Sequence, residues 1–407
     1  MHENGPLQGC RVLELGSTVA GPYCGRLLAD FGAEVIKVES PDGDPVRTFG
    51  DSFEGKSLYW ASLSRNKRVM SIDLRGEKGR DLVRQLIAKS DVLVENFRPG
   101  TMEKWGLGYE DVCKLRPGLV MVRISGFGQS GPNRLRPGFG IVGEALGGLR
   151  SITGDPDRPP SRAAVPLTDY LTGVYAALGT MLALFHRERT GQGQCVDAAL
   201  YEAAFSVMEG LVPAFEKLGK VATRAGSRLP GHAPNDLFPT GDDSYIHIAA
   251  GNTTVFRRLT DAMGQPELKD DARFAEATAR NANYEELRAM LTAWTTRHTL
   301  KELDEILTRN DVPAAPIYSV ADIFADAHYR ARDMLLEVPS DELGSVTIPG
   351  VVPKLTATPG RVRWAGRPHG ADTRSVLREV LGLDAEAIAG LEAEKVIGCG
   401  AGHEQQD

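Results

Sequence analysis

The sequence contains few cysteines and arranges none of them as a redox or metal motif. Its 407 residues include five cysteines, at positions 10, 24, 113, 195 and 399, without a C-x-x-C spacing. An odd, scattered set argues against a disulfide framework and a zinc site, and it is typical of a reducing compartment. We therefore expect a cytoplasmic protein.

Long apolar runs are also missing. The most apolar stretch, residues 170–185, is interrupted by Thr172, Gly173, Gly179 and Thr180, and it is shorter than the ~20 residues that a bilayer requires. The first ten residues, MHENGPLQGC, lack a cationic start followed by an apolar run, so no signal peptide is expected. The sequence predicts no membrane partner and a buried core helix at 170–185.

Neither sign of charge dominates. Lysine and arginine number 47 against 54 aspartates and glutamates, and the net charge of −7 predicts no nucleic-acid partner. The eight histidines form no H-x-x-x-H or H-E-x-x-H pair, and no G-x-S-x-G elbow occurs. The absence of these motifs argues against a metalloenzyme and against a serine hydrolase, and we expect no bound metal.

Short apolar runs alternate with helical patterns over the first 130 residues. The sequence predicts strands at 11–15, 33–39, 69–74, 91–97 and 119–125 and helices at 22–31, 76–90 and 110–115. Such alternation indicates βαβ units and a parallel sheet with helices on both faces. We therefore expect an α/β fold with a Rossmann-like parallel-sheet large domain.

The rest of the chain predicts a second, smaller domain. We expect mostly loop at 126–168, a short helix at 141–149, and then a long helix at 170–187, a strand at 194–200 and a helix at 201–218. After a loop-like boundary at 223–234 come a strand at 245–251, helices at 253–264, 283–297, 299–309 and 319–335, an extended segment at 346–355 and a helix at 372–381 that packs on the first domain. The expected domains are a large one at 1–224 and 336–407, built from both chain ends, and a smaller α+β one at 225–335.

A literal G-x-G-x-x-G occurs at 126–131, GFGQSG, directly after a predicted strand. A dinucleotide loop needs those glycines to open a helix, but the sequence continues PNRLRPG, with two prolines and no helical period. We interpret it as a glycine-rich turn.

Asp169 precedes the apolar part of the long helix. The simplest interpretation is that Thr168 or Asp169 caps that helix. The alternative is that a carboxylate at a partly desolvated helix start serves as a covalent nucleophile. Spacing alone leaves both open.

Basic residues follow several predicted strands, where ligands bind to parallel sheets. Arg75 follows one strand and Arg98 another, with Lys104, Arg134 and Arg136 nearby. Several cations at one edge suit a ligand with several phosphates, although each alone is equally well a solvated surface residue.

Taken together, six ordered segments resemble the class III CoA-transferase family, which includes the formyl-CoA, carnitine and succinyl-CoA-dependent transferases. They are LEL-x(4)-AGPYCGRLLADFGAEVIKVE (13–39), SRNKRVMSIDLR (64–75), DVLVENFRPGTMEKWGLGYE (91–110), SGFGQSGPNRLRPG (125–138), LTDYLTGVYAALG (167–179) and TGQGQCVDAAL (190–200). The resemblance implies an enzyme with acyl-CoA and carboxylic acid substrates, no permanently bound cofactor, and an interlocked homodimer.

The resemblance places Asp169 at the nucleophile of the family. It implies attack of Asp169 on the donor thioester, a mixed anhydride, and then an aspartyl-CoA thioester that the acceptor carboxylate resolves. It also implies CoA contacts from the residues Val19, Ala20, Ile72, Arg75, Asn96, Phe97, Arg98, Lys104, Arg136 and Phe139. Ser40 stands where some relatives have an arginine, and Arg47 is a possible replacement.

Two alternatives within the same fold stay open, an α-methylacyl-CoA racemase and a non-catalytic acyl-CoA-binding protein. By similarity, the racemases need a proton-transfer pair at the positions of Phe139 and Asn252, neither of which moves protons at neutral pH. A third hypothesis for the function is an NAD-dependent oxidoreductase. The GGGGQ lid of formyl-CoA transferases is missing, and the segment LPGHAPND (229–236) favours succinyl-CoA as donor and a dicarboxylate acceptor, with Arg224, Arg228 or His232 at its distal carboxylate.

Overall fold

The structure is a computed structural model and describes residues 5–400. These residues divide into two compact units. The first contains residues 5–149, 163–213 and 327–400, and the second contains 150–162 and 214–326. Each unit is described by itself.

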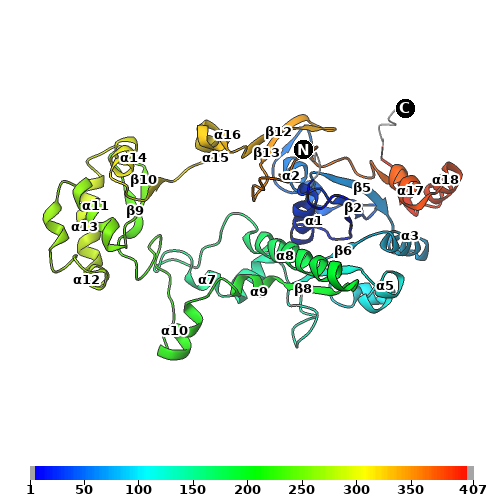
Figure 1. Cartoon of the computed structure of the whole chain (residues 1–407), viewed down its shortest axis with the longest axis horizontal. Coiled ribbons are helices and arrows are strands. Elements are labelled where there is room, and N and C mark those ends of the chain that lie inside the picture. Colours follow the sequence, from blue (N-terminus) through cyan, green and yellow to red (C-terminus); the bar gives the residue numbers. More distant parts are fainter. Residues whose placement is uncertain (1–4, 401–407) are drawn as a thin grey trace. The chain divides into compact units, whose positions relative to one another are not determined.

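A seven-stranded sheet forms the centre of the first unit (Figure 1). Its strands are β1 (Arg11–Glu14), β2 (Glu34–Glu39), β5 (Lys67–Ile72), β6 (Val92–Glu95), β7 (Val120–Ser125), β8 (Cys195–Ala199) and β14 (Ile397–Gly398). The order is β14-β5-β2-β1-β6-β7-β8, and only β14 runs antiparallel to its neighbour. The six parallel strands, counted along the chain, are in the Rossmann order 3-2-1-4-5-6. This confirms the expected parallel sheet and adds β14 at its edge.

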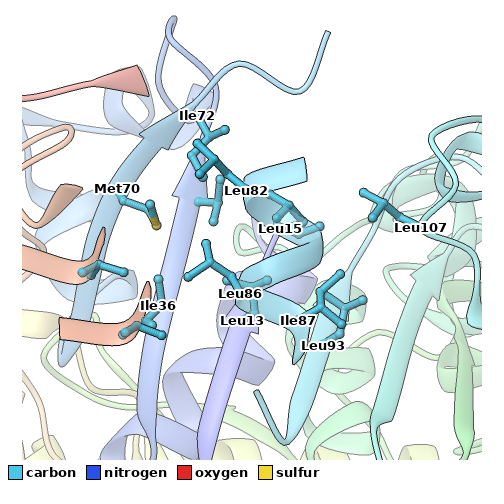
Figure 2. Packing of buried hydrophobic residues seen from close by; sticks show 14 of the residues in the cluster. Leu13, Leu15, Ile36, Met70, Ile72, Leu82, Leu86, Ile87, Leu93 and Leu107 are labelled. Atoms are coloured by element: carbon cyan, nitrogen blue, oxygen red, sulfur yellow. The ribbon is translucent and has the colours of Figure 1, made fainter. Parts of the chain in front are cut away.

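Helices cover both faces of this sheet. On one face, α1 (Ala20–Asp30) and α8 (Leu167–Thr190) bury side chains such as Leu28 and Leu184 against the valines of β1, β2, β6 and β7. On the other face pack α3 (Glu77–Ala88), α5 (Tyr109–Leu115) and α17 (Thr373–Leu381). Figure 2 shows Leu82 and Leu86 of α3 among the side chains of Leu13 and Ile36. The C-terminal helix therefore packs on the first domain, as the sequence predicts.

Shorter elements complete the first unit. They are η1 (Pro45–Thr48), β3 (Ser52–Phe53), β4 (Lys56–Ser57), α2 (Leu58–Leu63), α4 (Thr101–Lys104), α6 (Gly140–Leu146), α9 (Leu200–Phe205), α16 (Ala327–Ala331), β12 (Leu335–Ser340), β13 (Gly344–Pro349) and α18 (Ala385–Ala393). Two helices, α7 (Leu149–Ile152) and α10 (Leu211–Leu218), cross from one unit to the other.

The second unit is a small α+β body. Its antiparallel strands β9 (Asn235–Pro239), β10 (Tyr245–Ala249) and β11 (Ala314–Pro316) lie in the order β11-β10-β9. Its helices are α11 (Thr253–Ala262), η2 (Pro266–Lys269), α12 (Ala277–Ala282), α13 (Tyr284–Thr295), α14 (Leu300–Arg309) and α15 (Val320–Ala325). A core of its own, with Phe238, Phe256, Leu287 and Leu303, holds these elements together.

Three segments differ from the sequence predictions. The helix predicted at 201–218 is interrupted, because α9 ends at Phe205 and α10 begins at Leu211. The helix predicted at 319–335 ends at Ala325, since Asp326 has extended backbone with ψ 121°. Residues 150–162, assigned to the large domain from sequence, cluster with the second unit, where the Gly226 N–H donates to the Gly154 carbonyl at 3.1 Å.

Candidate active site

A pocket of about 400 Å³ opens at the carboxyl ends of the central strands. Leu15, Gly16 and Ser17 follow β1, residues 38–45 surround the end of β2, residues 72–75 follow β5, and Phe97 follows β6. Because β1 and β6 flank the point where the strand order reverses, this strand-edge pocket lies where Rossmann-type sheets bind their ligands.

Three of the residues predicted to contact CoA line the strand-edge pocket, namely Ile72, Arg75 and Phe97. The Arg75 side chain is largely exposed and folds back on Asp73, with Nε 2.8 Å from Oδ1. Val19 and Ala20 are buried at the start of α1. The guanidinium of Arg75 is thus available at the pocket mouth.

Asn96 is hydrogen-bonded to Ser17, in the turn after β1. Its Oδ1 accepts from the Ser17 N–H at 2.8 Å, and its Nδ2 donates to the Ser17 carbonyl at 2.8 Å. Both polar atoms of the amide are therefore engaged by the turn after β1.

The remaining predicted contacts do not line this pocket. Arg98 and Lys104 are exposed beyond β6. Arg136 lies over the ring of Phe127 at 5.5 Å, and Phe139 is 71% exposed at the start of α6. These last two belong to the loop that leads to Gly140 at the start of α6.

Several charged groups at the pocket were not found from sequence. Lys37 is fully buried, and its Nζ lies 2.8 Å from Asp44 Oδ2 and 3.2 Å from Glu14 Oε1. Burial opposes the ammonium form, but the carboxylates of Glu14 and Asp44 hold the pKa of Lys37 above its usual value. The sequence did contain a signal for these buried charges, because the apolar run RVLEL includes Glu14 and the apolar run EVIKVE includes Lys37.

Glu39, at the end of β2, is also engaged. Its Oε1 accepts from the Asp44 N–H at 3.0 Å and from Arg47 Nε at 2.9 Å, and its Oε2 accepts from Arg47 Nη2 at 2.8 Å. In NAD enzymes an acidic residue here binds the ribose hydroxyls, whereas this carboxylate is occupied. Arg47 is equally committed and does not line the pocket, so it is no substitute for the arginine missing at Ser40.

The segment GDSFEGKS (50–57) has the spacing of a P-loop, G-x-x-x-x-G-K-S. A phosphate-binding loop of that type joins a buried strand to a helix. Here the segment forms the short antiparallel pair β3 and β4, and Lys56 forms an ion pair with Glu342 at 2.7 Å. It is a surface hairpin.

Asp169 lies in the first turn of α8, but it does not cap the helix. The N-cap is Pro166, without a side-chain cap, so the capping interpretation of Thr168 or Asp169 is wrong. The Asp169 carboxylate instead lies against Gly140, the first residue of α6. A β-carbon at position 140 would be 1.8 Å from Oδ2.

The carboxylate of Asp169 is partly buried, and among residues 5–400 no other side chain forms a hydrogen bond or ion pair with it. Burial raises its pKa from 3.8 to about 6. At pH 7 such a group is still mostly ionised, and a poorly solvated carboxylate is a better nucleophile than one held by a cation.

Two tyrosines lie close to this carboxylate. The hydroxyls of Tyr59 and Tyr170 are 2.6 Å apart, and the rings of Tyr170 and Tyr23 meet edge to face at 4.7 Å. Burial raises the pKa of both Tyr59 and Tyr170, and the negative charge of Asp169 adds to the effect. Both phenols therefore stay protonated and polar near Asp169.

Close backbone packing brings these pieces together. Gly126 and Gly138 approach so closely that a β-carbon on either would be 2.9 Å from the other's α-carbon, which places the start of α6 beside the end of β7. No helix follows GFGQSG until Gly140, so the glycine-rich turn is confirmed. Gly173, one helical turn after Asp169, lies against the Ala20 carbonyl, where a β-carbon would be 3.0 Å away.

Comparison with known proteins matches residues 7–373 to CoA-transferase family III. The chain belongs to this family. It is 47% identical over 394 residues to succinyl-CoA–D-citramalate CoA-transferase of Chloroflexus aurantiacus, covering 96% of this chain and 98% of the relative. It is 42% identical over 397 residues to the β subunit of succinyl-CoA–L-malate CoA-transferase of the same organism, covering 96% and 98%.

Solved structures agree with this assignment. A CaiB/BaiF family protein from Brucella suis has a TM-score of 0.83 and 36% identity, covering 93% of this chain and 100% of that one. The protein is therefore an enzyme, a family III CoA-transferase with the mixed α/β fold of its relatives. In residues 5–400, no helix is long and apolar enough to cross a membrane.

The second unit of this family III transferase holds the three residues suggested for the acceptor. Arg224 donates to the carbonyls of Asp155 and Pro156 at 3.1 and 3.3 Å, and His232 Nδ1 is 3.4 Å from the Pro230 carbonyl. Arg228 instead stacks on Tyr284 at 3.5 Å, and its buried Nε has no hydrogen-bond partner. Asn252 caps α11 through the Thr254 N–H at 2.8 Å.

Proposed function

We propose that this transferase moves CoA from succinyl-CoA to a dicarboxylic acid through a thioester on Asp169. The observation that carries the proposal is the position of the Asp169 carboxylate, which lies directly against Gly140 and is partly buried, with no cationic side chain paired to it among residues 5–400. Burial raises its pKa to about 6, so this carboxylate is less strongly solvated than a surface aspartate, and weaker solvation favours it as a nucleophile.

The proposed reaction has two symmetrical halves. Asp169 attacks the thioester carbonyl of succinyl-CoA, the carbon–sulfur bond breaks, and the products are an aspartyl-succinyl anhydride and CoA thiolate. The thiolate attacks the aspartyl carbonyl, which releases succinate and leaves an aspartyl-CoA thioester. The acceptor carboxylate then attacks this thioester, and the thiolate cleaves the second anhydride at the acyl side. The new acyl-CoA leaves, Asp169 is regenerated, and no net proton is exchanged.

The strand-edge pocket is the proposed site of the CoA nucleotide, with Arg75 at a phosphate. Support comes from its place at the reversal of the strand order and from the partly buried Phe97, which offers apolar surface to a purine. Gly173 of α8 packs against the Ala20 carbonyl at the start of α1, and we propose that the pantetheine arm runs past this contact toward Asp169.

A dicarboxylate acceptor is supported by the names of the two relatives, since D-citramalate and L-malate are both dicarboxylates. Of the three residues suggested from sequence to bind the acceptor, Arg228 is the best supported. Its guanidinium lies over the Tyr284 ring, and its Nε has no hydrogen-bond partner among the described residues. Arg224 and His232 already contact backbone carbonyls.

The assembly that we propose is an interlocked homodimer in the cytoplasm. A row of exposed apolar side chains along α8 supports a second chain as partner: Val174, Tyr175, Leu178, Met181, Leu182 and Phe185. Light scattering should give twice the chain mass, and Leu182→Glu should reduce it, whereas Leu115→Glu on the exposed side of α5 should not. A monomer in the unmodified protein would contradict the dimer.

The cytoplasmic location is supported by the five cysteines, which are all free, as is typical of proteins in a reducing compartment.

The test of the function is a transfer assay. Purified enzyme is incubated with succinyl-CoA and, separately, D-citramalate, L-malate, glutarate or mesaconate, and chromatography measures new acyl-CoA and released succinate. We expect equal amounts of both with at least one acid and none with Asp169→Asn. Deuterium entering an α-methylacyl-CoA from D2O, without any transfer, would instead establish the racemase.

A further inference from the structure

The turn between β1 and α1 is held by side chains from three other segments. Lys37 Nζ donates to the Gly16 carbonyl at 2.7 Å, Asn96 binds the N–H and carbonyl of Ser17, and Asp44 Oδ1 accepts from the Thr18 N–H at 3.1 Å. Side chains therefore form hydrogen bonds with backbone groups of three consecutive residues, from the Gly16 carbonyl to the Thr18 N–H. Gly16 and Ser17 themselves line the strand-edge pocket.

The conformation held in this way is a strained one. Thr18 has φ 67°, in the left-handed region that a β-branched residue rarely adopts. Such a residue stays in place only where its surroundings fix it, and strained residues of this kind gather at functional sites. The strain therefore needs the anchors provided by Asn96 and Asp44.

Asn96 fits the turn closely. A β-carbon on Gly16 would be 3.1 Å from Asn96 Oδ1, and one on Gly21 would be 3.3 Å from Asn96 Cγ. The two glycines let the amide reach Ser17 from between the turn and the start of α1. With both amide atoms bound to Ser17, this side chain acts on the ligand through the turn.

Asp44 connects the same turn to the opposite wall of the pocket. It is 5% exposed, its Oδ1 also accepts from the Val46 N–H at 3.0 Å, and its Oδ2 pairs with Lys37 at 2.8 Å. Its own N–H donates to Glu39 at the end of β2. One carboxylate therefore fixes the loops after β1 and β2 against each other.

We propose that Asn96 and Asp44 are positioning residues, which hold residues 16–18 in the strained turn that shapes the strand-edge pocket for the CoA nucleotide. The proposal rests on the proposed function only in taking CoA as the ligand of this pocket. It assigns to Asn96 an indirect role in place of a direct contact with CoA.

Calorimetric titration of the full-length protein with free CoA tests this. Asn96→Ala should raise the Kd by about tenfold, because the turn relaxes out of its strained conformation. Adding Thr18→Gly should recover most of that loss, since glycine adopts positive φ without strain. Asn310→Ala is the matched control, because that amide also donates to a backbone carbonyl, of Ile306 at 2.8 Å in the second unit. It should bind CoA as the unmodified protein does.

A second variant and a kinetic readout keep the test decisive. Asn96→Asp retains the acceptor for the Ser17 N–H, but it replaces the donor to the Ser17 carbonyl with a charged oxygen, so it should also weaken CoA binding and show the same rescue, and it serves as the test if Asn96→Ala unfolds. With succinyl-CoA as substrate, KM should rise while kcat stays within about twofold, whereas a merely structural defect would lower kcat.

Results that contradict the role of Asn96 can be told apart from results that contradict the proposed function. Unchanged CoA affinity in Asn96→Ala would overturn the positioning role alone. Weakened binding that Thr18→Gly does not rescue would show that Asn96 contacts CoA directly. Failure of the unmodified protein to bind CoA would contradict the proposed function as well, and transfer without any effect of these variants would leave the function standing.

Discussion

The Asp169 carboxylate and the α-carbon of Gly140 are in direct contact, with Oδ2 placed where a β-carbon of residue 140 would project, 1.8 Å away. The two residues come from different helices, α8 and α6, and the contact exists because Gly126 and Gly138 close the loop that precedes α6. Position 140 thus fixes the place of the nucleophile in the proposed reaction.

Gly140→Ala should therefore displace Asp169 and slow transfer. We expect kcat to fall by about 100-fold, since displacements of about 1 Å have effects of that size, while the Kd of CoA stays unchanged. Steady-state kinetics and calorimetry measure the two quantities. Gly390→Ala in α18, where a β-carbon meets nothing within 4 Å, is the control and should leave both unchanged. Full activity in Gly140→Ala would show that the contact is not needed.

The raised pKa of Asp169 predicts how stability depends on pH. The folded state holds this proton up to about pH 6, against 3.8 for an ordinary aspartate, so ionisation costs stability as pH rises between these values. Asp169→Asn should therefore have a higher Tm than the unmodified protein at pH 8, and the difference should shrink as the pH falls from about 6 to about 4. Asp111→Asn on exposed α5 is the control. A lower Tm for Asp169→Asn at pH 8 would contradict the desolvated carboxylate.

The buried charges below the strand-edge pocket should be worth several kcal/mol as a set. Glu14 pairs with both Lys37 and Lys67, at 3.2 and 2.7 Å, with all three side chains inaccessible to solvent. Burial lowers the pKa of Lys67 to about 8. Glu14→Gln should destabilise the protein by about 3–5 kcal/mol in urea unfolding, because it leaves buried ammonium groups short of a counter-charge. Glu394→Gln removes an exposed partner of Lys78 and should change little. Equal stability of both variants would rule out this effect.

Arg75 tests the proposed phosphate contact. Arg75→Gln should weaken CoA binding about tenfold at low ionic strength and much less in 0.5 M salt, because an exposed charge contact is screened. Lys78→Gln, three residues along the chain and outside the pocket lining, removes the same charge and should have no effect. Salt-independent, unchanged binding in Arg75→Gln would remove this residue from the site.

The sequence predicts the parallel sheet well because its strands are buried on both faces. RVLEL and DVLVENF are continuous apolar runs, which read as strands whatever their neighbours. The edge strand β14, two residues long, has no such signal and forms only because it pairs with β5. The interruption after Phe205 is equally a property of packing, since the composition of 201–218 is helical throughout.

The site was predictable to a smaller extent. Resemblance and the strand-edge rule pointed to Asp169 and Arg75, and both assignments stay predictions. From sequence alone, an aspartate in the first turn of a helix cannot be told from a capping residue. Lys37 pairs with Glu14 across 23 positions, and Asp44 accepts from Thr18 across 26. Such pairs depend on sheet register, which the local pattern does not contain. Gly140 was missed because its importance lies in the side chain packed on it.

The most direct test of the central claim is the mass of the protein and of its Asp169 peptide after incubation with succinyl-CoA alone, without an acceptor. Transfer through the nucleophile predicts an adduct of CoA, less one water, on the peptide that contains Asp169, together with free succinate. Addition of a dicarboxylate acceptor should discharge the adduct as a new acyl-CoA, and Asp169→Asn should form none. New acyl-CoA without any adduct, or an adduct on another residue, would contradict the account.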